Sequence, residues 1–521
     1  MTLDSVGTQR KQTFQEALLD PDRLSVTWEL IPGRGAFEKS HEHVMRMAEQ
    51  SASDPRINGI TITDNPGGKP AILASIMAIE TKNTGIDTIV HFTCKDKNRN
   101  NIESDLYALA RAGVSNLLVM TGDYPSEGYT GLPKPVFDID AVHALRLIRQ
   151  LNSGLETPTY KGRISLKSTS FFPGAVISPF KQSEAELLPQ YYKLHKKVEA
   201  GARFIITQLG YDARKFDELI KYVNHQNINI PLIGNIFVLS APVARLMNRN
   251  EIPGCVVTHE MVEILEKERL ASGSTTINAK EASLFRASQL YAIFKGLGYS
   301  GVNISGHGLG YNDVISIISK GGELSPKWTE QIASFNYPQP RGFYYFTKDE
   351  KTGLNTDIPT DRKLTGNRRS SLRFKMFSLV HSMFFDEKSM LYPVFRIGAR
   401  IIDKTFLKRP FTWFEYIAKT LSNECLFCGD CAMHELGFIC PMSQCPKQQR
   451  NGPCGGSYNE WCEVYPGSRK CIFVTMYKTY KNSGKEEKLK QQYIPPCNWE
   501  LSRTSSWLNY FNGRDFSSFH E

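Results

Sequence analysis

The segment NLLVMTGD, residues 116–123, is a short apolar run that ends in a glycine and a carboxylate. Runs of this kind recur along the chain and alternate with helical stretches, a pattern that predicts parallel strands joined by crossover helices. We expect strands at residues 25–31, 57–63, 88–93, 116–121, 166–172, 203–208, 231–236 and 301–305. The expected helices include residues 40–51, 102–112, 141–152, 184–200, 213–225 and 281–297.

This alternation favours an α/β fold of the TIM (β/α)8 barrel type over a doubly wound sheet. No Gly-x-Gly-x-x-Gly fingerprint follows the first predicted strand, which weakens a Rossmann fold further. The barrel is expected at residues 23–315, after an N-terminal extension at 1–22. A linker and helical region at 316–420 follows, with a polar excursion at 348–373. The remainder is expected to be a small cysteine-rich metal-binding domain at 421–500 and a C-terminal tail at 501–521.

Polar side chains stand at the ends of the predicted strands, where the active sites of this fold form. They are Glu29, Thr63, Asp64, His91, Thr93, Asp123, Gln208 and Asn235. A polar residue that ends a strand usually caps a helix or forms a turn. Because several strands end this way, where apolar residues would otherwise fill the mouth, we expect a pocket at this end of the barrel.

Two of these carboxyls are expected to lie in opposed environments. Glu29 follows Trp28 in an apolar strand, so its carboxyl points into the barrel mouth, where desolvation raises the pKa and suits a general acid. Asp123 follows Gly122, where nearby backbone amides favour an ionised carboxylate beside a positive centre. Such a pair typically supplies an acid and an electrostatic stabiliser.

Eight of the eleven cysteines are concentrated near the C-terminus, at Cys425, Cys428, Cys431, Cys440, Cys445, Cys454, Cys462 and Cys471. Two-residue gaps place successive thiolates around one metal, and thiolates suit zinc or the iron of iron–sulfur clusters. A disulfide framework is the alternative, and it requires an oxidising compartment. The cluster therefore predicts a metal-binding domain that holds an iron–sulfur cluster or zinc.

The formal net charge of +10 raises the question of nucleic acid or membrane partners. No nucleic-acid motif accompanies the basic residues, so a solvated face or attraction of an anionic substrate is the better explanation. No uninterrupted apolar run is long enough to span a bilayer, and the N-terminus lacks the apolar core of a signal peptide. We expect a soluble, cytoplasmic homo-oligomer without membrane insertion and without nucleic acid.

The motifs at the strand ends also occur in a recognisable order. They are residues 26–29 (VTWE), 62–63 (IT), 91–94 (HFTC), 118–123 (LVMTGD), and 197–202 (KVEAGA) leading to 206–208 (ITQ). Together they resemble methylenetetrahydrofolate reductase. The tail, with residues 440–442 (CPM) and 451–456 (NGPCGG), resembles the cysteine-rich C-terminal domain of some bacterial members.

This resemblance implies a flavin-dependent barrel that reduces 5,10-methylenetetrahydrofolate to 5-methyltetrahydrofolate in one-carbon and methionine metabolism. Glu29 matches the general acid that protonates N10 of the folate, and Asp123 matches the carboxylate that stabilises the iminium cation. Gln208 matches a glutamine that contacts the folate. The positions that hold FAD are matched by Thr63, His91, Thr93, Gly122, Asp123 and Lys197.

Three departures from the family pattern bear on the electron donor, which is NAD(P)H or an electron-carrier protein. Thr121 replaces the arginine of the family's Arg-Gly-Asp, so one cationic flavin contact is missing, and Ser178 replaces an expected histidine. No nicotinamide-stacking aromatic is identified around residues 237–241. Candidates for the missing charge are Lys167, Arg163 and His195.

Other functions stay open at this point. The reaction could run in the oxidative direction. The barrel could be an inactive electron-transfer or assembly subunit, against which the Glu29 and Asp123 pair argues. It could also be a folate or corrinoid methyltransferase, but the zinc ligands of those enzymes belong to the catalytic barrel, whereas the thiols here are in an appended tail.

Overall fold

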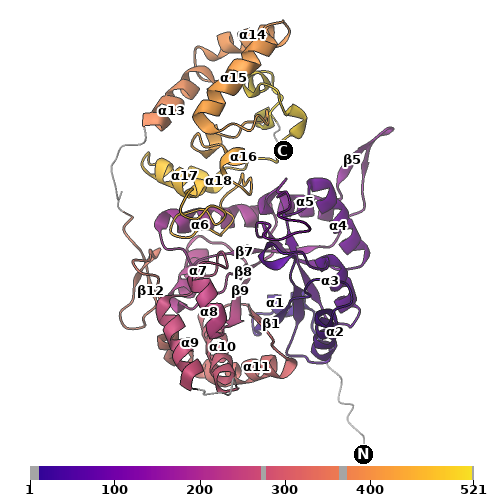
Figure 1. Ribbon diagram of the computed structural model, residues 1–521, viewed down its shortest axis with the longest axis vertical. Helices are drawn as coiled ribbons and strands as arrows, with labels where there is room; N and C mark the ends of the chain where they lie inside the picture. Colours follow the sequence, from indigo (N-terminus) through magenta and orange to yellow (C-terminus); the bar gives the residue numbers. More distant parts are fainter. Residues whose placement is uncertain (1–10, 272–276, 363–371, 519–521) are drawn as a thin grey trace, which may run out of the picture.

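The computed structural model describes residues 11–271, 277–362 and 372–518. Eight parallel strands form a closed barrel in the lower part of Figure 1. They are β1 (Ser25–Leu30), β2 (Gly59–Ile62), β3 (Thr88–Thr93), β4 (Asn116–Met120), β7 (Phe172–Ile177), β8 (Phe204–Thr207), β9 (Leu232–Val238) and β10 (Gly301–Gly306). Each strand pairs with the next one, and β10 closes the ring on β1. The predicted TIM barrel is confirmed.

Helices surround the barrel, and the strands are mostly buried, as expected for a parallel sheet that is covered on both faces. The longer helices are α2 (Lys39–Ala52), α3 (Ala74–Lys82), α4 (Arg99–Arg111), α5 (Ala141–Ser153), α6 (Glu184–Ala200), α7 (Ala213–His225), α8 (Ala241–Asn248), α9 (His259–Ala271), α10 (Ile277–Leu297) and α11 (Tyr311–Leu324). Shorter turns are η1 (Pro66–Gly68), η2 (Ser325–Lys327), α12 (Trp328–Gln331) and η3 (Ile332–Phe335). Local signals fix α6, which starts at the Ser183 and Glu186 capping box and ends at Gly201 with φ of 118°.

The N-terminal ends of the strands are closed by α1 (Phe14–Leu19). Phe14 is fully buried, and its ring lies edge-on to Phe204 and Phe172, with centroids 5.3 and 6.3 Å away. Phe172 and Phe204 are the first residues of β7 and β8. An aromatic cluster therefore fills this end of the barrel, which leaves the opposite end for a pocket.

The fifth barrel strand lies later than predicted. It spans residues 172–177, so the prediction of a strand at 166–172 was wrong. The chain before it forms the hairpin β5 (Glu156–Thr159) and β6 (Gly162–Ser165), which projects from the barrel in Figure 1. Pro173 and Gly174 hide the strand pattern, because both residues are rare inside strands. Gly174 is needed, since a Cβ there would lie 2.2 Å from the ring of Phe204.

The chain after the barrel forms a second region, which lies above the barrel in Figure 1. Its elements are α13 (Leu372–Phe384), α14 (Tyr392–Asp403), α15 (Lys408–Asn423), η4 (His434–Leu436), α16 (Pro441–Gln444), α17 (Ile472–Lys481), α18 (Lys488–Gln491), η5 (Trp499–Leu501), α19 (Ser506–Phe511) and η6 (Phe516–Ser518). Helices α17 and α18 pack against α6, and α19 packs against α14. We call residues 372–518 the C-terminal region.

The predicted polar excursion at 348–373 contains part of a hairpin. The hairpin of β11 (Phe346–Lys348) and β12 (Asn355–Pro359) packs against α7, where Asn355 donates a hydrogen bond of 2.7 Å to Asp217. Residues 363–371 lie outside the described residues.

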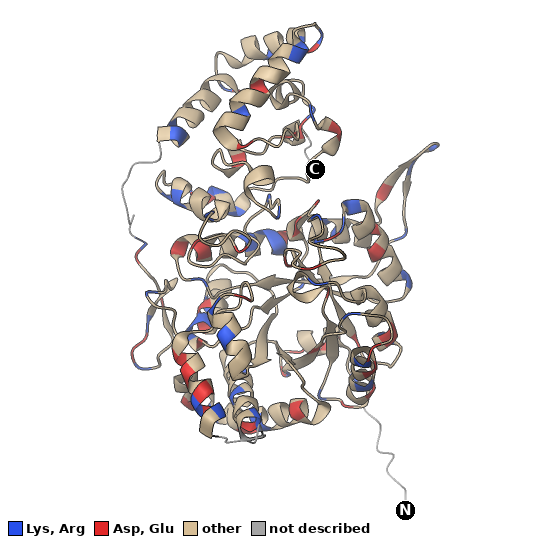
Figure 2. Cartoon of the chain, viewed as in Figure 1, with Lys and Arg blue, Asp and Glu red and all other residues tan. Residues whose placement is uncertain are grey.

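Charge is distributed in a mixed pattern, and acidic and basic residues are interspersed along the barrel helices (Figure 2). This mixture is typical of solvated helix faces. Among the helices described, none combines the length and the apolar composition that crossing a bilayer requires.

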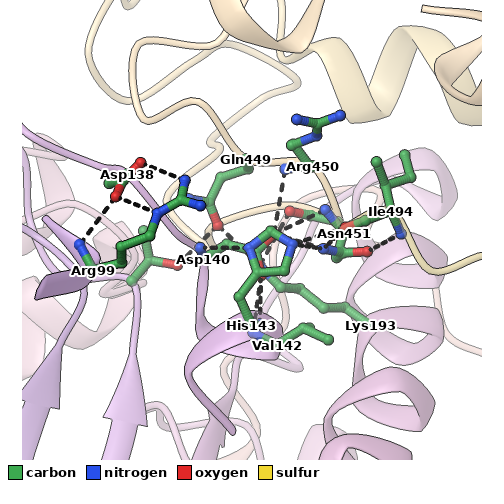
Figure 3. Close-up of polar contacts among 12 residues, drawn as sticks. Arg99, Asp138, Asp140, Val142, His143, Lys193, Gln449, Arg450, Asn451 and Ile494 are labelled. Carbon is green, nitrogen blue, oxygen red and sulfur yellow. Dashed lines mark hydrogen bonds and ion pairs between the residues drawn. The ribbon is translucent and has the colours of Figure 1, made fainter. Parts of the chain in front are cut away.

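A buried carboxylate joins the two regions (Figure 3). Asp140 caps α5 through one oxygen, and its other oxygen accepts hydrogen bonds from the backbone N–H groups of Arg450 (3.2 Å) and Asn451 (2.9 Å). The Asn451 amide exchanges two hydrogen bonds with the backbone of Ile494, at 2.8 and 2.9 Å. Burial would raise the pKa of Asp140, but the positive charge of Lys193 and the N–H donors outweigh burial and lower it.

The imidazole of His143 belongs to the same network. The backbone N–H of Asp140 donates to His143 Nδ1 at 3.0 Å, so the ring proton belongs on Nε2. His143 Nε2 lies 2.7 Å from the carbonyl oxygen of Ile494, to which it donates. The barrel and the C-terminal region are thus joined through groups that would be costly to leave unpaired.

We expect Asn451→Ala to destabilise the docked C-terminal region, because the variant leaves the buried N–H of Ile494 without a partner. A buried unsatisfied group costs about 1–3 kcal/mol. The denaturation midpoint, followed by tryptophan fluorescence, should fall relative to the wild type and to Asn482→Ala, which alters an exposed residue at the end of α17. An unchanged midpoint would contradict this role.

Candidate active site

A cavity of about 200 Å³ lies at the carboxyl ends of the strands. The sequence-predicted residues that line it are Glu29, His91, Gly122, Asp123, Lys197, Gln208 and Asn235. Thr63, Asp64 and Thr93 are not among the described residues that line it, and Thr93 instead donates a hydrogen bond of 2.6 Å to Asp64. The cavity is smaller than the about 300–1,000 Å³ typical of small-molecule sites, because the C-terminal region fills part of its mouth.

Glu29 and His91 face each other in this cavity. Burial raises the pKa of Glu29 to about 7, although a hydrogen bond from Asn303 opposes the shift. Burial lowers the pKa of His91 to about 4, so its imidazole is neutral at pH 7. The 3.8 Å between Glu29 Oε2 and His91 Nε2 exceeds hydrogen-bond distance. Glu29 is therefore a carboxyl that holds and releases a proton near neutral pH.

Asp123 lines the same cavity in a more polar setting. Its carboxylate accepts a hydrogen bond of 2.8 Å from the backbone N–H of Gly67. The preceding Gly122 has φ of 86°, and a Cβ there would lie 2.8 Å from the side chain of Lys95. The tight turn at Gly122 thus requires glycine and aims Asp123 at the cavity.

The C-terminal region contributes Lys447, Cys454, Gly455, Gly456 and Glu463 to the same lining. Lys447 Nζ donates a hydrogen bond of 2.8 Å to the carbonyl of Gly122 and forms an ion pair with Glu463. Both side chains are almost completely buried, at 4% and 7% exposed. A cation and an anion from the C-terminal region therefore stand in the barrel mouth.

Two barrel lysines hold the segment that carries these residues, which we call the strap, residues 447–457. Lys181 Nζ donates to the carbonyl of Ser457 at 2.6 Å, and Lys193 Nζ donates to those of Gly452 and Pro453 at 3.1 Å. The two lysines bind backbone carbonyl oxygens of the strap. These contacts therefore fix the backbone conformation of the strap.

Lys447 and Glu463 are lining residues that sequence analysis missed. Lys447 lies 325 residues from Gly122 along the chain, and no spacing pattern links the two. The proposed sources of the missing positive charge were wrong. Arg163 pairs with Glu156 on the projecting hairpin, Lys167 is exposed, and His195 lies against Tyr222 on the outer helices.

Several polar atoms around the cavity have no hydrogen-bond partner in the described structure. They are Thr63 Oγ1, His91 Nε2, Ser178 Oγ and Gln190 Nε2, all buried. His91, Ser178 and Gln190 line the cavity directly. Buried polar groups are almost always bonded, so these atoms indicate a wall built for a polar ligand.

The eight clustered thiols divide into two groups, and none of the eleven cysteines is in a disulfide. The first group lines a small cavity of about 20 Å³ and contains Cys425, Cys428, Cys431 and Cys440. The second contains Cys445, Cys454, Cys462 and Cys471. Burial raises the pKa of Cys445 to about 11, with Cys462 adding to the shift, and burial raises that of Cys471, with Cys454 adding to it.

Each group contains four of the eight clustered thiols, the number that a structural zinc or an iron–sulfur cluster requires, and a further thiol, Cys497, packs with Cys428 and Cys440 of the first group. Within residues 11–271, 277–362 and 372–518, however, no three His, Cys, Asp or Glu side chains are arranged to hold a metal ion. The metal therefore stays a prediction that rests on the donor set.

Two family models match this chain. The model described as "Methylenetetrahydrofolate reductase" matches residues 15–278, and the one described as "Methylene-tetrahydrofolate reductase C terminal" matches residues 406–500.

Individual relatives are distant. A probable methylenetetrahydrofolate reductase (NADPH) of Caenorhabditis elegans is 24% identical over 42% of this chain and 31% of its own length. The 5,10-methylenetetrahydrofolate reductase of Buchnera aphidicola is 21% identical over 41% of this chain and 65% of its own. The chain thus spans less than two-thirds of either relative.

A solved structure is described as an uncharacterized protein from Clostridium thermocellum that binds two copies of 5-methyl-5,6,7,8-tetrahydrofolic acid. It covers 60% of this chain and 99% of its own, with 14% identity and a TM-score of 0.41.

We predict that the Glu29 carboxyl titrates near neutral pH. Because burial raises its pKa to about 7, it should be protonated below that pH and ionised above it. Difference infrared spectra of the wild type against Glu29→Gln should show a carboxylic-acid band that disappears as the pH rises through about 7. A midpoint near the ordinary glutamate value of about 4.3 would mean that the carboxyl is solvated.

Proposed function

The chain belongs to the methylenetetrahydrofolate reductase family, and on that premise we propose that it reduces 5,10-methylenetetrahydrofolate to 5-methyltetrahydrofolate with a bound flavin. The observation that carries the proposal is the pair of carboxyls in one cavity, Glu29 with a pKa of about 7 and Asp123 bonded to a backbone N–H. Opposed environments of this kind let one carboxyl act as an acid while the other acts as an electrostatic stabiliser.

Glu29 would protonate N10 and so open the imidazolidine ring of the folate. A pKa near the working pH is what efficient general acid catalysis needs, since the group is then both protonated and ready to release the proton. The neutral His91 beside it adds no positive charge that would lower that pKa.

Asp123 would stabilise the positive charge that develops on the folate when the ring opens. Its carboxylate is fixed by the N–H of Gly67 and by the turn at Gly122, so little reorganisation accompanies the reaction. Gln208, which also lines the cavity, would contact the folate.

The polar groups of the lining suit FAD, whose reduced form would supply the hydride when bound. The unpartnered atoms of His91, Ser178 and Gln190 offer hydrogen bonds to a polar ring system, and Gly122 allows close approach of backbone. Of the positions implied by the family resemblance, His91, Gly122, Asp123 and Lys197 line the cavity and would hold the cofactor directly. Thr63 and Thr93, which are not among the lining residues, would support the cofactor-binding residues from outside the cavity.

The two thiol groups would each hold a metal, as zinc or as an iron–sulfur cluster. Cys454 of the second group lines the cavity, so iron in that group would lie beside the flavin and favour an electron-carrier protein as donor. Zinc in both groups would make the C-terminal region a scaffold and favour NAD(P)H.

Glu29→Gln should lower the rate of folate reduction by about 10²–10⁴-fold, because it removes the proton donor and keeps the shape. FAD should stay bound. The wild-type rate should fall as the pH rises through about 7, because the protonated acid is then lost.

The control for this variant is Glu42→Gln, which alters an exposed glutamate on α2 and should leave the rate unchanged. A Glu29→Gln rate close to that of the wild type would remove Glu29 from the role. A wild-type protein that neither binds FAD nor turns over folate would support the inactive-barrel alternative.

Metal analysis of anaerobically purified protein, with its visible spectrum, should show metal in both thiol groups. Cys428→Ser and Cys454→Ser should each lose the metal of one group, because a ligand is missing from each. Cys94→Ser, in the barrel core, should keep the full content. A folded wild-type protein without bound metal would contradict the metal proposal.

A further inference from the structure

The lining of the cavity contains an excess of acidic side chains. Glu29, Asp123 and Glu463 line it, and the lysines among the described lining residues are Lys197 and Lys447. Burial lowers the pKa of Lys197 to about 7, so much of its charge is absent at neutral pH. Burial likewise raises the pKa of Glu29 to about 7, so much of its negative charge is also absent. Without Lys447 the carboxylates of Asp123 and Glu463 would dominate the lining and would repel a ligand that carries phosphates or a reduced, anionic ring.

Lys447 is placed to act on such a ligand. Its ammonium group has three N–H donors, and its partners in the described structure are the carbonyl of Gly122 and the carboxylate of Glu463. Its ammonium group also lies 6.0 Å from the centroid of the Phe137 ring, and the side chain lines the cavity. Because the side chain is only 4% exposed, its charge is poorly screened by solvent.

Lys447 also lies next to the position at which the barrel sequence departs from the family pattern. Thr121 stands where the family has an arginine, and its hydroxyl donates instead to Gln449 of the strap at 3.0 Å. The strap thus occupies the space beside Thr121 and brings a different cation to the neighbouring Gly122.

We propose that Lys447 is a flavin-binding residue, and that the flavin site is shared between the barrel and the strap. Lys447 replaces from the C-terminal region the positive charge that Thr121 does not provide. Glu463 positions Lys447, and Lys181 and Lys193 position the strap through its carbonyls. This inference rests on the proposed flavin-dependent function.

The alternative hypothesis is that the Lys447–Glu463 ion pair only stabilises docking of the C-terminal region on the barrel. The two hypotheses differ in their effect on FAD affinity once docking is preserved. The test therefore replaces both charges together, as Lys447→Met with Glu463→Gln, because removal of one partner alone would leave a buried charge unpaired.

The experiment titrates flavin-free full-length protein with FAD and measures the dissociation constant from the change in flavin fluorescence. The double variant should bind FAD about ten- to a hundredfold more weakly, the usual effect of a lost charge-assisted hydrogen bond. Lys447→Arg should stay within a few-fold of the wild type. Lys478→Met, which removes an exposed ion-paired lysine on α17, is the matched control and should not change affinity.

Limited proteolysis of each variant reports whether the strap stays docked. A double variant with a wild-type proteolytic pattern and wild-type FAD affinity would overturn this inference and leave the proposed function standing. A wild type that binds no FAD would overturn both. If the double variant does not fold, Lys447→Gln is titrated instead, and unchanged affinity there also overturns the inference.

Discussion

The whole arrangement depends on a carboxylate buried between the barrel and the C-terminal region. Asp140 caps α5 with one oxygen and accepts the backbone N–H groups of Arg450 and Asn451 with the other. A buried charge is tolerated only when its hydrogen bonds are complete. If the two regions separated, the Asp140 carboxylate would lose its N–H donors from the strap, and those N–H groups would lose their acceptor. The strap therefore lies across the strand ends, and the charges of Lys447 and Glu463 enter the cavity as a consequence of this docking.

Burial also sets the chemistry of the barrel residues that line the cavity. The same loss of water raises the pKa of Glu29 to about 7 and lowers that of His91 to about 4, because in each case the charged form is disfavoured. One residue is thereby kept as a proton donor and the other as a neutral hydrogen-bonding group. Asp123 keeps a backbone N–H as its partner. The cavity thus contains a desolvated carboxylic acid, Glu29, and a hydrogen-bonded carboxylate, Asp123.

The sequence predicted those features that depend on neighbouring residues or on a periodic pattern of apolar residues. Alternation of apolar runs and helices predicted the barrel, and polar residues that end the strands predicted the cavity that contains Glu29, Asp123 and Gln208. The fifth strand was misplaced because Pro173 and Gly174 lack the strand pattern, while the need for Gly174 comes from the packing of Phe204. Lys447 could not be found, because its contact with Gly122 joins residues 325 apart and is set by docking of a separate region. The grouping of the thiols required spatial proximity as well as spacing.

The central claim is that the ligand site is built from both regions of the chain. Hydrogen–deuterium exchange of the full-length protein, with and without added FAD, tests it most directly, because amide exchange reports local opening segment by segment. The account predicts that FAD slows exchange in residues 447–456 of the strap together with residues 118–124 of the barrel. Protection confined to the barrel, with residues 447–456 exchanging at the same rate in both samples, would contradict it.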